Sequence, residues 1–311
     1  MSTGHISVLL QEAVDALEPH TGGVYIDGTF GGGGHTTELL TRLHGDATVY
    51  AIDADPDAMV RADELRAMDI GRGLIPVHDN FRNLAAIGSE QRIPPVNGIL
   101  LDLGLSSFQL DQADRGFAFR FDGPLDMRFD PTHGPSAADI VNTYTQEEIA
   151  DIIWRYGEES RSRQIARAIV ERRKRQPFTS TADLASVVEN AVGGRRGKAI
   201  HPATKTFQAL RIAVNDELTA LESVLTAAVD LLAPRGRLAV ISFHSLEDRI
   251  VKQFMALEST DCICPPDVPV CVCHHSARLK RIGKPVRPTA QEQAANSRSR
   301  SAIMRVAARL N

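Results

Sequence analysis

The chain has 311 residues, of which 43% are hydrophobic and 24% are charged, and its formal net charge is −4. These values are ordinary for a globular protein of one large domain or two, and they argue against an indiscriminate nucleic-acid binder. The chain does not open with a basic stretch followed by an apolar run, and no apolar run approaches a membrane-spanning length. We therefore expect a cytoplasmic protein without membrane association.

The first feature that carries chemistry is a glycine-rich turn after a predicted strand. Residues 5–17 predict a short helix, and the apolar residues 24–26 then predict a buried strand that ends at Asp27. Five glycines follow between positions 28 and 34, and the helical pattern resumes at residues 36–43. Glycine allows positive φ and lets a ligand lie against the main chain. A tight connection without a ligand is the alternative.

Asp53 follows the second predicted strand, residues 48–52. A carboxylate about twenty residues after such a turn accepts hydrogen bonds from ribose hydroxyls. The turn and Asp53 together predict a site for an adenosine-containing cofactor in an α/β domain. NAD and S-adenosylmethionine fit these two features equally well.

Two further residues follow predicted strands of the same sheet. Phe81 comes shortly after the third strand, residues 73–77, where an aromatic ring either covers an adenine or joins the core. Asp102 lies near the end of the fourth strand, residues 96–103. Because ligands collect at the carboxyl ends of parallel strands, we expect Asp102 beside the cofactor.

The pattern changes after residue 110. Helical segments dominate residues 110–203, one of them opened by the capping-box pair Thr145 and Glu148. This stretch is too long for a loop, so it predicts an inserted helical domain. Residues 205–232 then predict one long helix that returns to the sheet. Residues 237–243 and 302–307 predict the last strands.

Positive charge is concentrated in two segments. Residues 161–211 contain 12 Lys and Arg against 3 Asp and Glu, and residues 261–311 contain 9 against 3. Basic clusters of this kind contact phosphates, and a solvated helix face is the simpler alternative. Few aromatic residues accompany them, so stacking of several bases is not indicated.

Six blocks of the sequence, in order, resemble those of the bacterial small-subunit (16S) rRNA cytosine-N4 methyltransferases. The resemblance runs from about His5 to Arg305. The blocks are the glycine turn that begins at Asp27, then Asp53, and residues 100–109, 123–128, 206–211 and 242–249.

The resemblance implies an α/β fold, a Rossmann-like class I methyltransferase sheet with an inserted helical domain. Residues 1–109 and 204–311 would form the S-adenosylmethionine-binding domain, and residues 110–203 the helical substrate-recognition domain. The implied reaction is S-adenosylmethionine-dependent methylation of the N4 amine of a specific cytidine in the decoding region of 16S rRNA, in the small ribosomal subunit. The oligomeric state stays open, with a homodimer as one alternative.

The resemblance also implies which residues bind the cofactor. His35 is expected to act through its backbone more than through its imidazole. The implied set is Gly33, Gly34, His35, Asp53, Phe81, Asp102 and Gln109.

The catalytic prediction starts from a weak nucleophile. A cytosine amine has its lone pair delocalised into the ring, so an acceptor for its hydrogens assists the attack once the amine is aligned with the methyl group. Many amino-methyltransferases place Asn/Asp-Pro-Pro-aromatic after strand four, but residues 102–107 contain no proline. Asp102, Ser106 and Ser107 are therefore candidate acceptors, with Asp126 behind them. We predict Asp102, Ser107 and Asp126 as the catalytic set, with a cofactor contact as the alternative role of Asp102.

Two other features of this region have open roles. Residues 111–131 predict a mobile loop that closes over the target base. His244 follows the fifth strand, where it either contacts the base or makes a structural hydrogen bond.

All four cysteines lie within twelve residues, at positions 262, 264, 271 and 273. Disulfides are rare in cytoplasmic proteins, and four thiolates suit zinc. The C-x-C spacing differs from the usual C-x2-C knuckle, however, and the resemblance implies no required metal. The sequence therefore assigns no metal site, and structural zinc and a loop of free thiols stay open.

Two other function classes share part of the pattern. A nicotinamide oxidoreductase would have the glycine turn and Asp53, but it would not explain the basic helical insertion. A nucleic-acid-binding protein without activity would have the basic segments, but it would not need an intact cofactor turn.

Overall fold

The computed structural model describes residues 7–195, 200–265 and 270–311, except the side chain of Ser107. The chain divides into two compact units. Residues 1–104 and 218–311 form one, here called the sheet unit, and residues 105–217 form the other, the helical unit. None of the described helices combines the length and the apolar character needed to cross a bilayer.

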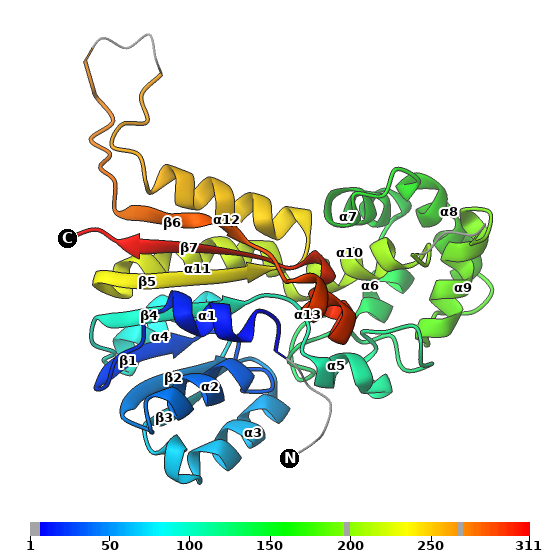
Figure 1. Cartoon of the computed structure of the whole chain (residues 1–311). Coiled ribbons are helices and arrows are strands. Elements are labelled where there is room, and N and C mark those ends of the chain that lie inside the picture. The colour runs from blue at the N-terminus through cyan, green and yellow to red at the C-terminus, as the bar shows by residue number, and fades with distance from the viewer. Residues whose placement is uncertain (1–6, 196–199, 266–269) are drawn as a thin grey trace. The chain divides into compact units, whose positions relative to one another are not determined.

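The sheet unit contains one seven-stranded sheet of order β3-β2-β1-β4-β5-β7-β6 (Figure 1). Strands β1 to β5 are parallel, and β7 runs antiparallel to both β5 and β6. The predicted α/β class is therefore confirmed, although β6 was not predicted. The strands are β1 (Gly23–Asp27), β2 (Ala47–Asp53), β3 (Leu74–His78), β4 (Val96–Asp102), β5 (Leu232–Ser242), β6 (Leu279–Val286) and β7 (Ile303–Arg309).

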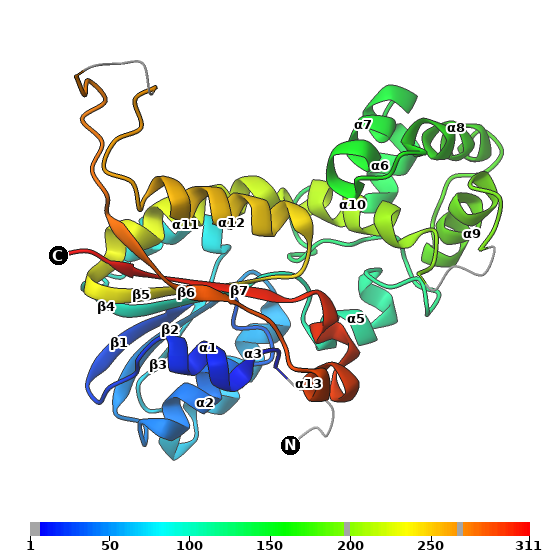
Figure 2. The ribbon, with the colours of Figure 1, turned by 45° about the horizontal axis from the view of Figure 1, so that its top comes forward.

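Helices cover both faces of the sheet (Figure 2). Successive residues of a strand point to opposite faces, so Tyr25 packs in the core layer with Leu39 of α2, and Ile26 packs in the layer with Val224 of α11. The helices of this unit are α1 (Leu10–Ala16), α2 (Gly34–Arg42), α3 (Pro56–Arg66), α4 (Leu84–Glu90), α11 (Glu217–Leu231), α12 (Ser245–Leu257) and α13 (Ala290–Ala295).

The helical unit has its own apolar core. Ile153, Ile165 and Leu184 are fully buried there and come from three successive helices. The capping box predicted at Thr145 is present, with Glu148 as its partner. The helices are α5 (Ser107–Asp111), α6 (Ala137–Thr143), α7 (Gln146–Gly157), α8 (Ser162–Arg173), α9 (Thr181–Ala191) and α10 (Thr204–Asn215).

The long helix predicted for residues 205–232 is wrong. Asp216 adopts a left-handed conformation (φ 48°) and separates α10 from α11. Helix α10 packs on α7, where Gly157 allows a close approach: a Cβ there would lie 2.6 Å from the carbonyl oxygen of Lys205. The two compact units divide at 104/105 and 217/218, whereas the boundaries predicted from the sequence were 109/110 and 203/204, and the assignment of one part to the cofactor and the other to the substrate stays a prediction.

Candidate active site

The turn between β1 and α2 requires glycine at two positions. Gly33 has a φ of +74°, and a Cβ there would lie 2.6 Å from the ring of Phe30. At Gly34, the first residue of α2, a Cβ would lie 2.0 Å from the Oγ of Ser7. Side chains are thus kept away from the first turn of α2, whose backbone N–H groups have no partner within the helix. Such a turn can receive the polar end of a ligand.

Asp27, the last residue of β1, ties this turn to α2. Its Oδ2 accepts a hydrogen bond from Thr36 Oγ1 (2.7 Å), and its Oδ1 accepts one from the Thr29 amide (3.2 Å). Burial raises the pKa of Asp27 to about 6, and the two hydrogen bonds oppose the rise. We assigned Asp27 no role from the sequence, although its place at the end of an apolar strand was the available signal.

Asp53, at the end of β2, holds the glycine turn through the main chain. Its Oδ2 accepts from the Gly31 amide (2.7 Å) and its Oδ1 from the Asp55 amide (2.9 Å). Burial raises the pKa of Asp53 to about 6, against the effect of both amide bonds. Each carboxylate oxygen has a second lone pair, so Asp53 can fix the turn and still accept from ribose hydroxyls.

Asp102, at the end of β4, has the least satisfied carboxylate of this edge. Its amide donates to Thr29 Oγ1 (2.6 Å), and its Oδ2 lies 3.7 Å from His35 Nδ1. Its Oδ1 is buried and has no hydrogen-bond partner in the described part of the chain. Burial raises the pKa of Asp102 to about 6, and the nearby His35 acts to lower it. A buried acceptor without a donor is costly, so a ligand N–H suits this position.

The other two residues at this edge have mainly structural contacts. The His35 side chain is buried, and its Nε2 lies 3.0 Å from the carbonyl oxygen of Val8. Phe81 follows β3 and packs partly against the core layer that contains Ile26. A Cβ on Gly28 would lie 3.7 Å from the Cβ of Phe81, so the aromatic residue borders the start of the glycine turn.

Two of the predicted site residues lie in α5 of the helical unit. Gln109 is buried and forms a reciprocal capping box with Ser106: the Ser106 amide donates to Gln109 Oε1 (3.1 Å), and the Gln109 amide donates to Ser106 Oγ (3.2 Å). Ser107 begins the helix, but its side chain lies outside the described residues. The cofactor role of Gln109 and the catalytic role of Ser107 stay predictions.

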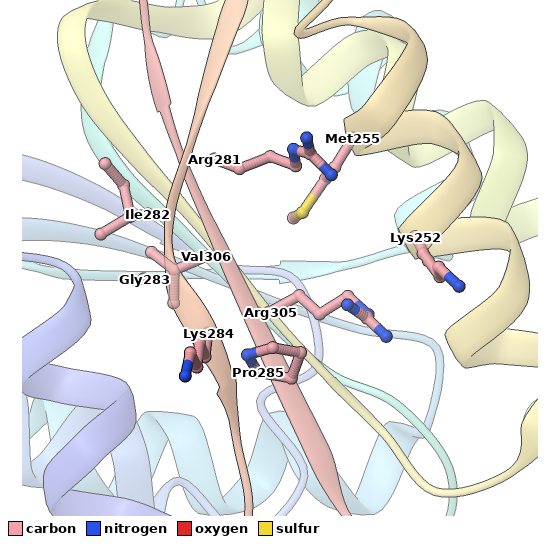
Figure 3. A pocket seen from close by; sticks show the side chains of 9 residues that line it. All are labelled: Lys252, Met255, Arg281, Ile282, Gly283, Lys284, Pro285, Arg305 and Val306. Carbon is pink, nitrogen blue, oxygen red and sulfur yellow. The ribbon is translucent and has the colours of Figure 1, made fainter.

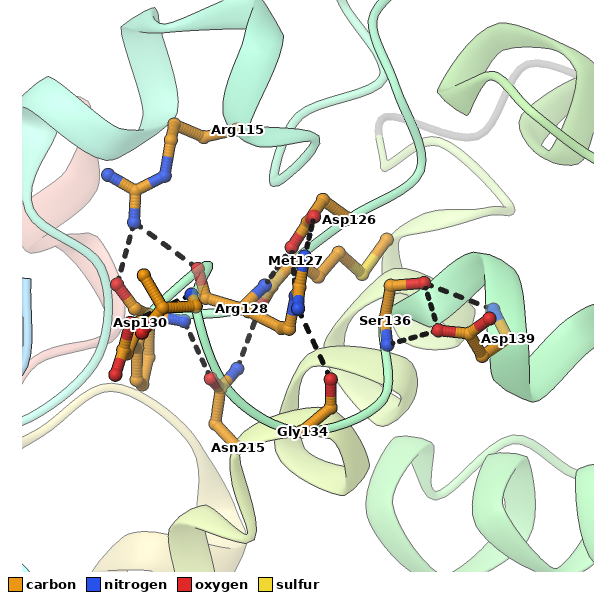
Figure 4. A network of polar contacts seen from close by, with 11 residues as sticks. Arg115, Asp126, Met127, Arg128, Asp130, Gly134, Ser136, Asp139 and Asn215 are labelled. Carbon is orange, nitrogen blue, oxygen red and sulfur yellow. Dashed lines mark hydrogen bonds and ion pairs between the residues drawn. The ribbon is translucent and has the colours of Figure 1, made fainter.

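Asp126, also in the helical unit, is engaged by Arg128 (Figure 4). The guanidinium donates to both carboxylate oxygens, from Nε to Oδ1 (2.9 Å) and from Nη2 to Oδ2 (2.7 Å). Burial acts to raise the pKa of Asp126, but the ion pair with Arg128 dominates and the pKa is lowered. Asp126 is thus an ionised acceptor whose best directions are already occupied.

The loop predicted for residues 111–131 is anchored in its second half. Leu125 and Met127 are almost fully buried in the core of the helical unit. Arg115 donates to the Phe129 carbonyl (2.8 Å), and Asn215 both donates to the Met127 carbonyl (2.8 Å) and accepts from the Phe129 amide (2.8 Å). Figure 4 shows these contacts converging on one turn. These contacts support the turn around Met127, and closure of the loop over the target base stays a prediction.

His244 has the structural role that was one of its two alternatives. It is the N-cap of α12, with its Nδ1 accepting from the Glu247 amide (3.4 Å). The Glu247 carboxylate is buried and accepts in return from the amides of Phe243 (2.8 Å) and His244 (3.3 Å). A role in contacting the base remains untested.

Comparison with known proteins places this site in a family. The sequence of residues 2–310 matches the family model of the MraW methylase family. The chain belongs to the MraW methylase family. It is 54% identical over 311 residues to the ribosomal RNA small subunit methyltransferase H of Thermomicrobium roseum, covering 100% of this chain and 95% of that protein. It is 53% identical over 307 residues to the protein of the same name from Dehalococcoides mccartyi, covering 98% of this chain and 86% of that one.

Membership of the MraW methylase family decides several predictions. The chain is a class I S-adenosylmethionine-dependent methyltransferase, so the predicted enzyme class and cofactor are confirmed. The nicotinamide and non-catalytic alternatives are excluded. The individual site residues are not tested by this membership and remain predictions.

The basic segment of the helical unit includes both structural and exposed arginines. Arg172 pairs with Asp183 (2.6 Å), and Arg173 donates to the Val141 carbonyl (2.8 Å), so these two stabilise the fold. Arg163 and Arg167 lie one turn apart on α8 and are exposed, as is Arg175 after the helix. The phosphate-contact prediction therefore applies to exposed arginines such as these three.

The sheet unit of this MraW methylase carries a second basic surface, beside the edge strand β6 (Figure 3). A hollow of about 340 Å³ lies between α12 and β6–β7, with Lys252, Arg281, Lys284 and Arg305 among its lining residues. Arg305 is paired with Asp248 (2.8 Å), which leaves three exposed cations. Charged residues on an edge strand also prevent pairing with other sheets, so these cations have a structural explanation and phosphate contact by them stays a prediction.

Proposed function

We propose that this enzyme methylates the N4 amine of a specific cytidine in the decoding region of 16S rRNA, in the small ribosomal subunit. The observation that supports the substrate class is the identity of 54% over the whole chain with a protein named ribosomal RNA small subunit methyltransferase H. The choice of cytosine N4 rests on the six sequence blocks that resemble the cytosine-N4 methyltransferases. A cytoplasmic location and a homodimeric state remain predictions.

The residues at the carboxyl edge of the sheet fit S-adenosylmethionine. Gly33, Gly34 and His35 would hold its methionine end through the main chain, and Asp53 would accept from its ribose hydroxyls. The unpartnered Oδ1 of Asp102 supports the fit, because a buried acceptor needs a donor and the cofactor carries amino groups. Phe81 would lie against the adenine, and Gln109 of the helical unit would complete the set. When bound, this cofactor supplies an electrophilic methyl group on a sulfonium.

The protein's part in the reaction is to orient the amine and receive its proton. A hydrogen-bond acceptor for the amine hydrogens makes the nitrogen lone pair less delocalised into the ring and more available to attack the methyl group. The same acceptor can take the proton that the amine loses. Asp102, Ser107 and Asp126 are the proposed acceptors. Asp102 has a free oxygen and a pKa of about 6, so it is mostly ionised at neutral pH. Asp126 is held by Arg128, which favours a positioning role for it.

The helical unit is proposed to recognise the RNA. Exposed arginines of α8 would contact phosphates, and the exposed cations beside β6 in the sheet unit are further candidates for such contacts. Phosphate contacts position a nucleic acid without reading its sequence. The target base must also be unpaired or flipped to reach a methyltransferase site.

The direct test is the position of the methyl group. The enzyme is incubated with isotopically labelled S-adenosylmethionine and with 16S rRNA, either free or in assembled small subunits. Nuclease digestion and mass spectrometry of the nucleosides should yield labelled N4-methylcytidine, and Asp102→Asn should reduce it strongly. A methyl group on ribose, on a ring carbon or on protein would overturn the proposal.

A further inference from the structure

The four cysteines lie on a segment that has no core of its own. This segment runs between α12 and β6 and extends away from both (Figures 1 and 2). In its described residues, 259–265 and 270–278, no side chain is buried. Connections of about 20 residues without secondary structure are uncommon in compact domains. Something other than hydrophobic burial must therefore fix its conformation.

The base of the segment is well anchored. The Arg278 guanidinium donates to Glu258 Oε2 (2.6 Å) and to Asp230 Oδ1 (2.8 Å). The main-chain amides of Arg278 and Leu279 both donate to the Glu258 carbonyl (2.8 and 2.9 Å). The Ala277 amide donates to Asp261 Oδ1 (3.2 Å). These contacts bring the two ends together and leave the part that holds the cysteines to be fixed by other means.

The sulfur atoms converge although they come from two separate arms. The four Sγ atoms lie within 4.8 Å of one another. Cys271 Sγ is 3.5 Å from both Cys262 Sγ and Cys273 Sγ, and Cys273 Sγ is 3.9 Å from Cys262 Sγ. Sulfur atoms on a tetrahedral zinc ion, with Zn–S of about 2.3 Å, are separated by about 3.8 Å. These three separations are close to the edge of such a tetrahedron, and the fourth sulfur lies within 4.8 Å of the others.

The two arms have the same local design. In an extended chain, residues i and i+2 point to one side and the residue between them to the other. Each C-x-C arm accordingly directs its sulfurs inward, while the middle residues Ile263 and Val272 stay exposed at 48% and 67%. The Ile263 amide donates to Cys273 Sγ and the Val272 amide to Cys264 Sγ, each at 3.4 Å. Each arm therefore supplies an amide to a sulfur of the other arm.

We propose that Cys262, Cys264, Cys271 and Cys273 form a structural tetrathiolate site for one zinc ion. Amide donors to the sulfurs are the outer contacts that orient metal ligands and stabilise thiolate charge. With four protein ligands the site is closed, so its role is to fix the segment and not to catalyse. The C-x-C spacing alone left structural zinc and free thiols as alternatives. The convergence of the four sulfurs and the reciprocal amide hydrogen bonds favour zinc.

The test begins with metal content. Full-length protein purified from zinc-supplemented culture without chelators should contain about one zinc per chain by elemental analysis. Cys262→Ser and Cys271→Ser should each lose most of the metal. His274→Ala, which changes an exposed residue next to Cys273, should retain it and serves as the matched control. S-Adenosylmethionine affinity, measured by calorimetry, reports whether each variant is folded.

A second measurement needs no variant. Hydrogen exchange at the Ile263 and Val272 amides should be slow in the zinc form and fast after chelation, while exchange in β7 should not change. Titration of the wild-type protein with a mercurial should release zinc as the four thiols react. Protein without zinc, iron in place of zinc, two disulfides by mass spectrometry, or exchange that chelation leaves unchanged would each overturn the proposal.

Discussion

Asp102→Asn is expected to make the protein more stable without its cofactor and much less active with it. The side chain keeps nearly the same volume and one carbonyl oxygen, but it loses the negative charge. The change therefore separates the stability cost of burying this charge from the contribution of the charge to methyl transfer. Both effects follow from the surroundings of one carboxylate, which is partly buried and has an oxygen without a partner.

The stability effect depends on pH, with a sign fixed by the direction of the pKa shift. The pKa of Asp102 is raised from 3.8 to about 6, so its ionisation opposes folding. The cost is absent below about pH 4, where the group is protonated in both states, and is complete above about pH 6. A shift of this size corresponds to about 3 kcal/mol, so we expect Asp102→Asn to gain about 1–3 kcal/mol at neutral pH.

Urea unfolding of the protein without cofactor measures this gain at pH 7.5 and again near pH 4. Asp46→Asn, which changes an exposed carboxylate of the same unit, is the matched control and should be neutral at both. Methyl transfer by Asp102→Asn should fall about tenfold to a hundredfold, the value of a charge-assisted hydrogen bond. Equal stability of variant and wild type at neutral pH, or full activity, would refute the reasoning.

Three further outcomes are expected. Asp53→Ala should lower S-adenosylmethionine affinity in calorimetry about tenfold to a hundredfold, and wild-type binding would remove Asp53 from the site. Gly33→Ala should cost both stability and cofactor affinity, because its φ of +74° and the Phe30 ring oppose a side chain; unchanged unfolding in urea would contradict this. Charge reversal of Arg163, Arg167 and Arg175 should weaken RNA binding and flatten its dependence on salt while leaving cofactor affinity unchanged. An unchanged salt slope in filter binding would make them a solvated face.

The parts of the sheet that carry the cofactor site could be predicted from sequence because each strand there is a short apolar run followed by a polar residue. Strand β6 could not, because it lies at the edge of the sheet and most of its residues are exposed and charged or small. The break at Asp216 was missed for a related reason: neither glycine nor proline marks it, and a left-handed conformation is uncommon outside glycine even though aspartate is among the residues that adopt it most readily. In both places the apolar pattern carries no signal.

The site was less predictable than the fold because its chemistry depends on distant partners. Arg172 lies in the basic segment predicted to contact phosphates, but it pairs with Asp183 and so stabilises the fold. Asp126 and Arg128 are two residues apart, so an ion pair between them could have been considered from the sequence. Only the structure shows that the guanidinium donates to both carboxylate oxygens. The Oδ1 of Asp102, by contrast, has no hydrogen-bond donor near it in the described part of the chain. A local sequence pattern cannot show that such a donor is missing.

The carboxylates also explain, on electrostatic grounds, why this glycine turn suits S-adenosylmethionine better than NAD. Asp27, Asp53 and Asp102 end three adjacent strands, and each has a pKa raised to about 6 with burial as the main cause. Asp27 contributes to the rise at both of the others, so the three groups interact. At neutral pH this edge holds mostly ionised acids, and the guanidinium of Arg61 donates to the Gly31 carbonyl beside them (3.0 Å). The pyrophosphate of NAD would add negative charge to this edge. The sulfonium and ammonium groups of S-adenosylmethionine bring positive charge, which interacts favourably with carboxylates that burial has deprived of water.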